Sequence, residues 1–353
     1  MTQFIGCDAH KKYSVFVAVD EHGHVGRAQR VEHDRPGYRQ FLEQLPARSS
    51  IAIEASGHYY WLVDEMERAG HLPQLANPAE AKRRMGKTKK TDKVDASNLA
   101  ILLRNGTLPT VWIPPAQLRD QRELLRMRMF LVGTRTRVKA RIHGALARYN
   151  VTVAETSDLF GVEGRRLLAS RLEQLPEQTR GSVEQQLATL DFLELQIADA
   201  EQRLQPLRES SVEAGLLQTL PGIGKILGLV LSLEIGRVER FPSAAHLASY
   251  AGLVPRVHAS GGHTRLGQVR SDVNRYLKWA FVEAVNGIVM QQRNYGGSHV
   301  LRLYQRIRRK RNHPRAVVAV ARHLAEAAFW VLKKQEVYRE PQAHPQTLSS
   351  THG

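Results

Sequence analysis

The first 110 residues contain short apolar runs that alternate with amphipathic segments. Five runs have the length and composition expected of strands: residues 4–7, 15–19, 27–31, 51–54 and 72–75. Apolar residues at helical spacing follow the third, fourth and fifth runs. Three strands, a helix, and then alternating strand and helix is the order of an RNase H-like sheet. Residues 1–110 are therefore predicted to form an α/β domain.

A proline-bounded segment and two long helical patterns follow this domain. Residues 108–115 (LPTVWIPP) are expected to be extended and to lead out of the domain. Residues 117–149 and about 182–209 carry apolar side chains at three- and four-residue spacings, close to heptads. We predict a helical, coiled-coil stalk over residues 116–212 that is suited to oligomerisation. The alternative is a helical bundle packed within one subunit.

The last part of the chain is predicted to be a mainly helical domain over residues 213–338. Two apolar helical segments flank the sequence PGIG, which predicts a helix-hairpin-helix. Gly222 and Gly224 would let backbone N–H groups approach a phosphate at a helix N-terminus. Further helices are predicted at residues 243–250, 271–290 and 314–333, and the polar residues 339–353 are predicted to be a flexible tail.

The charge of the chain indicates a polyanionic partner. Lysine and arginine number 51 against 34 aspartate and glutamate residues, a formal net charge of +17. Such an excess favours nucleic acid, because each phosphate contact releases counterions. Cys7, the single cysteine, excludes an internal disulfide and a CxxC zinc site. The sequence has no apolar run of membrane-spanning length and no signal-peptide pattern, so a cytoplasmic location is expected.

Two basic segments are the expected contacts to nucleic acid. Residues 82–93 (KRRMGKTKKTDK) are dense in lysine and arginine and lead directly into two acidic residues. A charge run of this kind is usually a solvated face, but its position favours contact with nucleic acid. The arginine-rich pattern at 117–149 is expected to bind phosphate backbones in the same way. The candidate contacts in the first segment are Lys87, Lys89, Lys90 and Lys93.

Four acidic residues of the first domain are candidate metal ligands. Asp8 and Glu54 lie at the ends of predicted strands, and Asp92 and Asp95 are three apart at the start of a helical pattern. Carboxylates are the oxygen ligands that Mg²⁺ prefers. Two such ions about 4 Å apart can stabilise both the attacking and the leaving oxygen of an in-line displacement. The sequence therefore predicts metal-assisted chemistry on a phosphodiester.

A second candidate site lies in VHASGGHTRLG. The glycines after Ser260, Gly261 and Gly262, permit a sharp turn and a close approach of the backbone to a phosphate. Arg256 and Arg265 flank the turn and can bind phosphate oxygens. A serine hydroxyl is a weak nucleophile until something activates it. From the spacing alone, Ser260 is either a nucleophile or only a hydrogen-bonding residue in a phosphate-binding turn.

The order of five motifs resembles the DEDD transposases of insertion sequences, a group that includes the Piv-type invertases and the bridge-RNA-guided recombinases. The motifs are GCDAHKK, IAIEASGHYY, KTDKVDA, LPGIG and FPSAAHLASYAGLVPRVHASGG, and the resemblance extends from about residue 4 to about residue 335. It implies a RuvC-like first domain whose four acids bind Mg²⁺, with Mn²⁺ as a possible substitute. It also implies that Ser260 attacks DNA and forms a phosphoserine link. Ser249 and Ser271 lie near enough in the sequence to remain alternatives.

The same resemblance implies the partners of the protein. An RNA encoded beside the gene would pair with donor and target DNA, and subunits would dimerise and then form a tetramer. The expected function is an insertion-sequence transposase or recombinase, located with the nucleoid in a bacterial cytoplasm. Two alternatives remain: a metal-dependent junction-resolving nuclease without a covalent serine intermediate, and a nucleic-acid-binding protein without catalytic activity.

Overall fold

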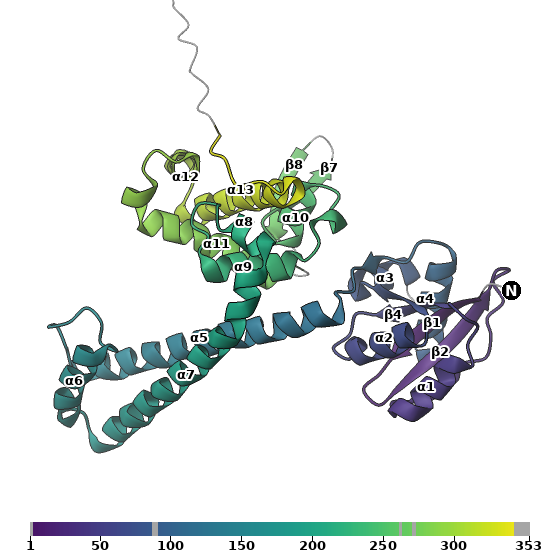
Figure 1. The fold of residues 1–353 in the computed structure, drawn as a ribbon, viewed down its shortest axis with the longest axis horizontal. Coiled ribbons are helices and arrows are strands. Elements are labelled where there is room, and N and C mark those ends of the chain that lie inside the picture. The colour runs from purple at the N-terminus through teal and green to yellow at the C-terminus, as the bar shows by residue number, and fades with distance from the viewer. Residues whose placement is uncertain (1–2, 87–90, 261–262, 270–272, 342–353) are drawn as a thin grey trace, which may run out of the picture. The chain divides into compact units, whose positions relative to one another are not determined.

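The computed structural model of the protein describes residues 3–86, 91–260, 263–269 and 273–341 (Figure 1). The chain divides into two compact units, Met1–Arg119 and Asp120–Gly353. The first unit is a mixed α/β structure and the second is mostly helical. None of the helices in the described residues is long and apolar enough to cross a membrane.

The first unit is built on a six-stranded sheet in the order β3-β2-β1-β4-β5-β6. The strands are β1 (Gln3–Ala9), β2 (Tyr13–Asp20), β3 (Gln29–Glu32), β4 (Ser50–Glu54), β5 (Leu72–Ala76) and β6 (Thr110–Val111). β1 is antiparallel to β2 and parallel to β4, and β5 continues the parallel part. This arrangement is compatible with the predicted RNase H-like sheet. The short edge strand β6 was predicted only as an extended segment, because two residues leave no alternation to detect.

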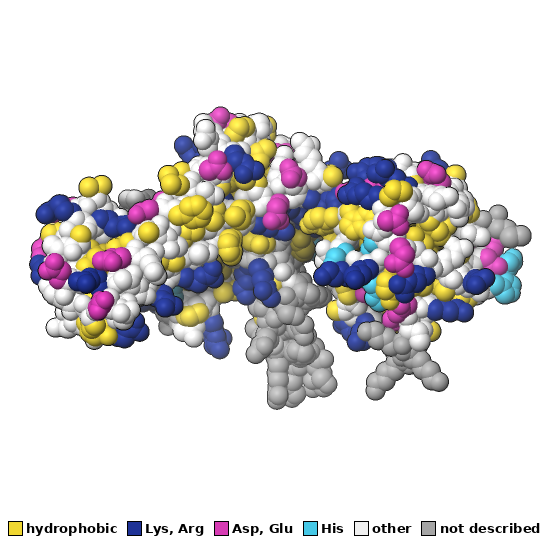
Figure 2. Space-filling view, turned by 90° about the horizontal axis from the view of Figure 1, so that it is seen from below, with side chains coloured by type: hydrophobic (Ala, Val, Ile, Leu, Met, Phe, Trp, Pro, Cys, Tyr) yellow, Lys and Arg dark blue, Asp and Glu magenta, His cyan; other side chains and the backbone are white. Residues whose placement is uncertain are grey.

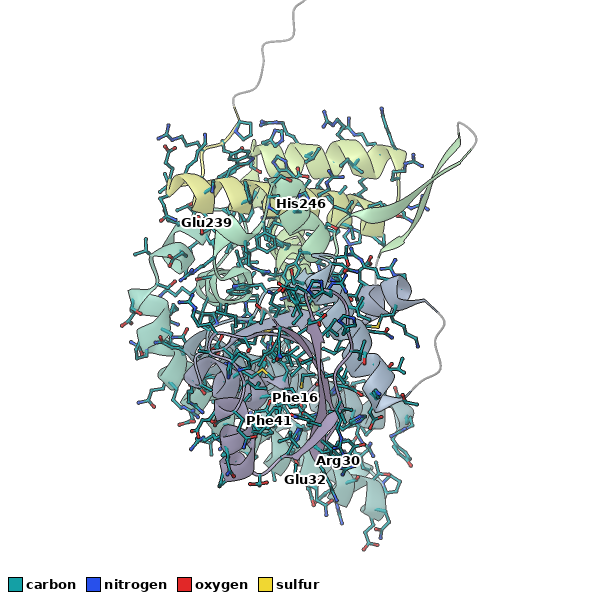
Figure 3. All side chains as sticks on the ribbon, turned by 90° about the vertical axis from the view of Figure 1, so that its right-hand side faces the viewer. Phe16, Arg30, Glu32, Phe41, Glu239 and His246 are labelled. Atoms are coloured by element: carbon teal, nitrogen blue, oxygen red, sulfur yellow. The ribbon has the colours of Figure 1, made fainter. Side chains whose placement is uncertain are left out.

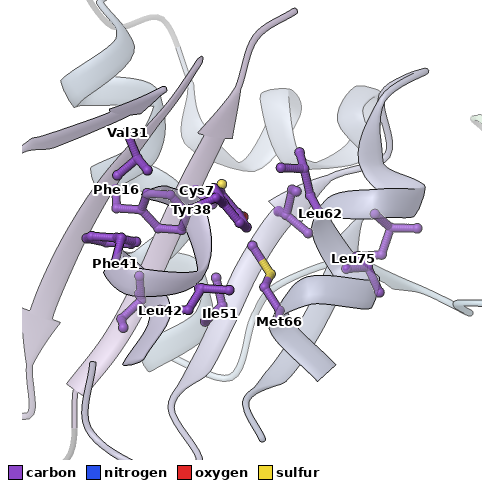
Figure 4. Close-up of a cluster of buried hydrophobic side chains, with 13 residues drawn as sticks. Cys7, Phe16, Val31, Tyr38, Phe41, Leu42, Ile51, Leu62, Met66 and Leu75 are labelled. Atoms are coloured by element: carbon purple, nitrogen blue, oxygen red, sulfur yellow. The ribbon is translucent and has the colours of Figure 1, made fainter. Parts of the chain in front are cut away.

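Helices cover both faces of this sheet. The helices are α1 (Arg35–Glu43), α2 (Tyr59–Arg68), α3 (Pro78–Met85) and α4 (Asp92–Arg104). Ile5 and Cys7 of β1 belong to the core cluster with residues of α1 and α2 (Figure 4). The residue between them, Gly6, faces α4 on the opposite side. Successive residues of a strand point to opposite faces, so one side of β1 builds the core and the other meets α4.

Two long helices of the second unit cross one another at an angle (Figure 1). They are α5 (Ala116–Arg148), which begins at the end of the first unit, and α7 (Glu177–Ser210). Leu131, Leu193 and Ile197 pack between them. The short helix α6 (Val162–Arg171) contributes to a second cluster beside both helices. We had not predicted α6, because its sequence VEGRRLLASR has too few apolar residues to show helical spacing. α7 begins five residues before the predicted start at 182.

The rest of the second unit, where it is described, consists of helices and a β-hairpin. The elements are α8 (Val212–Leu217), α9 (Lys225–Ile235), α10 (Ala244–Tyr250), β7 (Pro255–Ser260), β8 (His263–Val269), α11 (Arg275–Met290), α12 (His299–Lys310) and α13 (His313–Lys334). α12 was not predicted, although its apolar residues Val300, Leu303, Tyr304 and Ile307 lie at helical spacing. The predicted helix at 271–290 begins at Arg275, where Asn274 accepts hydrogen bonds from the first turn. Most of the tail, residues 342–353, lies outside the described residues.

Candidate functional site

A close approach between β1 and α4 positions the predicted acidic site. A Cβ atom on Gly6 would lie 1.9 Å from the carbonyl oxygen of Ala96, far inside any real contact. Only glycine therefore allows the α4 backbone to lie this close to β1. Asp8 is two residues further along β1, on the same side as Gly6. The missing side chain of Gly6 thus brings the start of α4 toward Asp8.

The start of α4 carries two of the predicted acids. Thr91 caps the helix, and its hydroxyl oxygen accepts a hydrogen bond from the Val94 backbone N–H at 3.3 Å. Asp92 and Asp95 both lie in the first turn. The positive end of the helix dipole stabilises negative charge there. The helix therefore presents carboxylates toward the strand that carries Asp8.

Three side chains come together where β1, β2 and α4 meet. The Nε2 atom of His10 lies 3.1 Å from Asp8 Oδ2 and 3.3 Å from Asp92 Oδ2. Among the described residues, the ligand atoms of Asp8, His10 and Asp92 all lie within 4.8 Å of one another. Neither Asp95 nor Glu54 joins this closely spaced set. The sequence pointed to two of its three members and missed His10.

Glu54 nevertheless lies at the same end of the sheet. Ile53 pairs with Cys7 in the parallel ladder, so Glu54 at the end of β4 is beside Asp8 on the neighbouring strand. The alternation of the two strands puts both carboxylates on the α4 side. Asp95 is near enough for its charge to act on Asp8. The structure thus groups the four predicted acids at one end of the sheet, and two of them are in close contact with His10.

Tyr13 holds His10 and Asp92 in place. Its ring lies 4.6 Å from the His10 ring, centroid to centroid, and its hydroxyl donates a hydrogen bond to Asp92 Oδ2 at 3.0 Å. The guanidinium carbon of Arg30 lies 3.6 Å from the centre of the Tyr13 ring, and Arg30 also pairs with Glu32 (Figure 3). The sequence carried no local signal for His10, because this residue follows the end of β1 and its contact Asp92 is distant along the chain.

The electrostatics of Asp8 fit a cation site. Burial raises the pKa of the Asp8 carboxyl above its usual value. The neighbouring charge of His10 lowers this pKa, whereas those of Asp95 and Asp92 raise it. A carboxylate that is partly buried among other carboxylates is costly to ionise unless a cation is present. The donor set, carboxylate oxygens with one imidazole, is therefore suited to a divalent metal ion.

The second predicted site lies on the β7–β8 hairpin. Ser260 is the last residue of β7 and pairs with His263 of β8. The predicted glycine-rich turn between these two residues lies outside the described residues and stays a prediction. Several predicted residues lie outside the described residues: Gly261, Gly262, Ser271, Lys87, Lys89 and Lys90. The side chains of Arg256, Ser260 and Arg265 also lie outside them. Ser249 is exposed on α10, and Lys93 is exposed on α4.

The PGIG turn joins α8 to α9 as expected, and its two glycines differ. Gly222 has a φ of +74°, and a Cβ atom there would lie 2.4 Å from the Ala284 carbonyl oxygen of α11. The close packing of this turn against α11 is thus sufficient to explain why residue 222 is a glycine. Gly224 is the N-cap of α9 and has open space where a Cβ atom would be. Gly224 therefore remains the better candidate for a backbone contact with phosphate. Basic side chains are spread over the face of the molecule shown in Figure 2.

Both units match families of transposases. A model of DEDD transposases of the IS110 type, described as transposase, matches residues 5–151, and a model described as transposase IS116/IS110/IS902 family matches residues 214–299. The chain is 26% identical to the transposase for insertion sequence element IS1111A of Coxiella burnetii, over 96% of this chain and 91% of that protein. It is 25% identical to a probable family 20 transposase of Pseudomonas aeruginosa, over 95% and 98%.

A local match adds a relative with a different name. The pilin gene-inverting protein of Moraxella lacunata is 55% identical over 53 residues, which are 15% of this chain and 16% of that protein. The longer matches cover nearly the whole of this chain and of each relative. The two family models cover the acidic site of the first unit and the PGIG turn and hairpin of the second. The chain therefore belongs to the IS110 family of DEDD transposases.

Proposed function

We propose that this transposase cuts and rejoins DNA through metal-assisted attack by Ser260 on a phosphodiester. The observation that carries the proposal is the close grouping of Asp8, His10 and Asp92 in a chain whose two units match transposase families. We further propose that an RNA encoded by the element selects the donor and target DNA. The chain would act as a dimer, and as a tetramer when two DNA duplexes are brought together.

The residues that would hold the metal are Asp8, Asp92, Asp95 and Glu54. When bound, a divalent ion such as Mg²⁺ polarises the scissile phosphate and stabilises charge on its oxygens. The chain contributes the geometry. Gly6 lets α4 approach β1, Thr91 fixes the start of α4, and Tyr13 orients Asp92 through its hydroxyl. These contacts hold the carboxylates in position before DNA arrives.

The serine step conserves the phosphoester. A bond forms between Ser260 Oγ and phosphorus while the bond from phosphorus to one deoxyribose oxygen breaks. The serine proton ends on the departing oxygen, so a free DNA hydroxyl and a phosphoserine ester result. A hydroxyl from the partner strand then attacks the ester in reverse and restores the serine. Strand exchange between the two steps rejoins DNA without an external energy source.

The charge of the chain supports binding to DNA and RNA backbones. Several arginines of α5 already pair within the second unit: Arg126 with Glu234, Arg128 with Glu201 and Arg135 with Glu194. The exposed Arg141 and Arg148 are therefore stronger candidates for phosphate contacts on this helix. Lys93 is exposed at the start of α4, near the acidic site, and is the matching candidate in the first unit.

A covalent-trapping assay tests this proposal. The full chain is mixed with the RNA from the native flank, Mg²⁺ and labelled nicked donor DNA, and the products are separated under denaturing conditions. We expect a protein–DNA adduct that is absent in Ser260→Ala and in Asp8→Asn. Ser249→Ala, a change at the alternative serine of the same unit, serves as the matched control and should form the adduct. Cleavage without an adduct that survives in Ser260→Ala would instead indicate the junction-resolving nuclease.

A further inference from the structure

The imidazole of His10 lies between two carboxylates of the proposed metal site. Its Nε2 atom is 3.1 Å from Asp8 Oδ2 and 3.3 Å from Asp92 Oδ2. We propose that His10 is itself a metal ligand and that this nitrogen donor makes the site prefer Mn²⁺ to Mg²⁺. The inference rests on the metal site of the proposed function, and it adds a ligand and a metal preference to that site.

The spacing of the three atoms is that of ligands around one ion. Two ligand atoms about 2.1 Å from an octahedral ion, in neighbouring positions, are about 3 Å apart. The separations from Nε2 to the two oxygens are close to this value, and all three atoms lie within 4.8 Å of one another. Small shifts of side chains would therefore place all three around a single ion.

The surroundings of His10 hold its ring at this place. The backbone N–H of His10 donates to the Tyr13 carbonyl oxygen at 2.9 Å, which fixes the turn between β1 and β2. The Tyr13 ring lies against the imidazole, tilted by 31°, and Arg30 covers the ring of Tyr13 in turn. The hydroxyl of the same tyrosine also donates to Asp92. One aromatic residue thus orients two of the three ligands, as supporting contacts do around other metal sites.

A mixed donor set changes the preferred ion. Mg²⁺ takes oxygen ligands almost exclusively and gives up its water reluctantly. Imidazole nitrogen suits transition ions, and Mn²⁺ is the transition ion that carboxylates also accept readily. Two carboxylates with one imidazole therefore favour Mn²⁺. Asp95 and Glu54, at the same end of the sheet, would be the further oxygen ligands of the proposed site.

A different role for His10 predicts the opposite effect of its removal. As a protonated counter-ion, His10 would neutralise Asp8 and Asp92, and a metal ion would have to displace it. Removal of the imidazole would then tighten the binding of every divalent ion. As a ligand, its removal weakens binding, and weakens the binding of Mn²⁺ more than that of Mg²⁺. The sign of the change separates the two roles.

The experiment measures Mn²⁺ binding to the full chain without nucleic acid. Free Mn²⁺ is followed by electron paramagnetic resonance, and Mg²⁺ affinity is obtained by competition. We expect His10→Ala to weaken Mn²⁺ binding about tenfold or more and Mg²⁺ binding by less. His24→Ala is the matched control, because His24 pairs with one carboxylate, Asp20, at 2.9 Å on the surface. This control should bind both ions as the wild type does.

A spectroscopic readout covers the case in which His10→Ala fails to fold. Pulsed electron paramagnetic resonance of wild-type protein with bound Mn²⁺ should show coupling to a directly bound nitrogen. The coupling should change when histidine is labelled with ¹⁵N, and it should persist in His24→Ala. Absence of this coupling, or tighter metal binding in His10→Ala, overturns the inference. The Asp8→Asn variant distinguishes failure of this inference from failure of the proposed function. If Asp8→Asn binds Mn²⁺ as the wild type does, the metal site itself is wrong.

Discussion

Two carboxylates of the first unit, Glu65 and Asp8, have opposite surroundings. The Glu65 side chain is 1% exposed and accepts hydrogen bonds from Arg39 at 2.6 Å and from two further arginines, Arg35 and Arg68. The hydrogen bond from Arg39 outweighs burial and lowers the pKa of Glu65. Asp8 is less buried, 18% exposed, yet burial and its acidic neighbours raise its pKa.

The comparison distinguishes structural acids from those that we propose to be functional. A buried carboxylate that arginines neutralise is satisfied within the fold. Glu234 in the second unit repeats this pattern, because Arg126 binds both its oxygens at 2.8 and 2.9 Å and Asn274 donates to one of them. A carboxylate that faces other carboxylates is stabilised by a bound cation. A carboxyl pKa that is perturbed by burial and by neighbouring charges often marks a functional site.

The largest expected effect is that of Asp8→Asn on activity. Loss of this carboxylate should reduce strand transfer by at least about 100-fold, measured as product formed from labelled donor DNA. The same change should not lower the thermal midpoint of the metal-free protein at pH 7. The folded-state pKa of Asp8 is raised, so its ionised form costs stability once the pH exceeds that pKa. A fall in the thermal midpoint would contradict the contrast between Asp8 and Glu65.

Gly6→Ala should disturb the same site through the backbone. The new Cβ atom would meet the Ala96 carbonyl oxygen, and neither backbone can yield without separating α4 from β1. We expect a loss of about 3 kcal/mol in the free energy of unfolding, measured by urea titration, and weaker metal binding. Gly133→Ala on α5 is the matched control, because nothing lies within 4 Å of its Cβ position. That change should leave stability the same or slightly higher.

Glu65→Gln tests the structural side of the comparison. The amide keeps the shape but loses the charge that three arginines bind, and we expect about 2 kcal/mol of destabilisation at pH 7. The pKa of Glu65 is lowered in the folded state, so its stabilisation is present above the unfolded-state pKa and is lost as the pH falls through the folded-state pKa. The difference between wild type and variant should therefore shrink in acid. A difference that does not change with pH would mean that the ion pairs contribute little.

Local patterns in the sequence explain why much of the first unit was predictable. Short apolar runs predicted β1, β2 and β4, and the helical spacing after Thr91 predicted α4 with both aspartates in its first turn. The neighbourhood of Asp8 and Asp92 depends instead on a long-range contact. That contact is the missing Cβ of Gly6 against Ala96, which no local spacing reveals. His10 was missed for the same reason, because its role depends on where Asp92 arrives.

The second unit shows the limit of pattern reading for short or basic elements. α12 was missed although its apolar residues Val300, Leu303, Tyr304 and Ile307 repeat at helical spacing among arginines and a lysine. The hairpin of β7 and β8 was also missed, although a Gly-Gly pair between two short segments is a hairpin signal. Both segments are rich in polar and charged residues, so few apolar side chains mark them as strands. The serine chemistry proposed for it stays a prediction until the adduct is sought.

The smallest expected effect is at Cys7, the residue next to Asp8. The pleat of β1 turns Cys7 into the core, where it is fully buried, and burial raises the pKa of its thiol to about 12. A thiol that stays protonated and inaccessible does not react, because the thiolate is the nucleophile. We expect no reaction of native protein with a thiol reagent at pH 8, complete reaction after unfolding in urea, and unchanged Mn²⁺ binding in Cys7→Ala. Rapid labelling of the native protein would mean that this end of β1 opens. The assignment of one face of β1 to the core and of the other face to the acidic site would then be wrong.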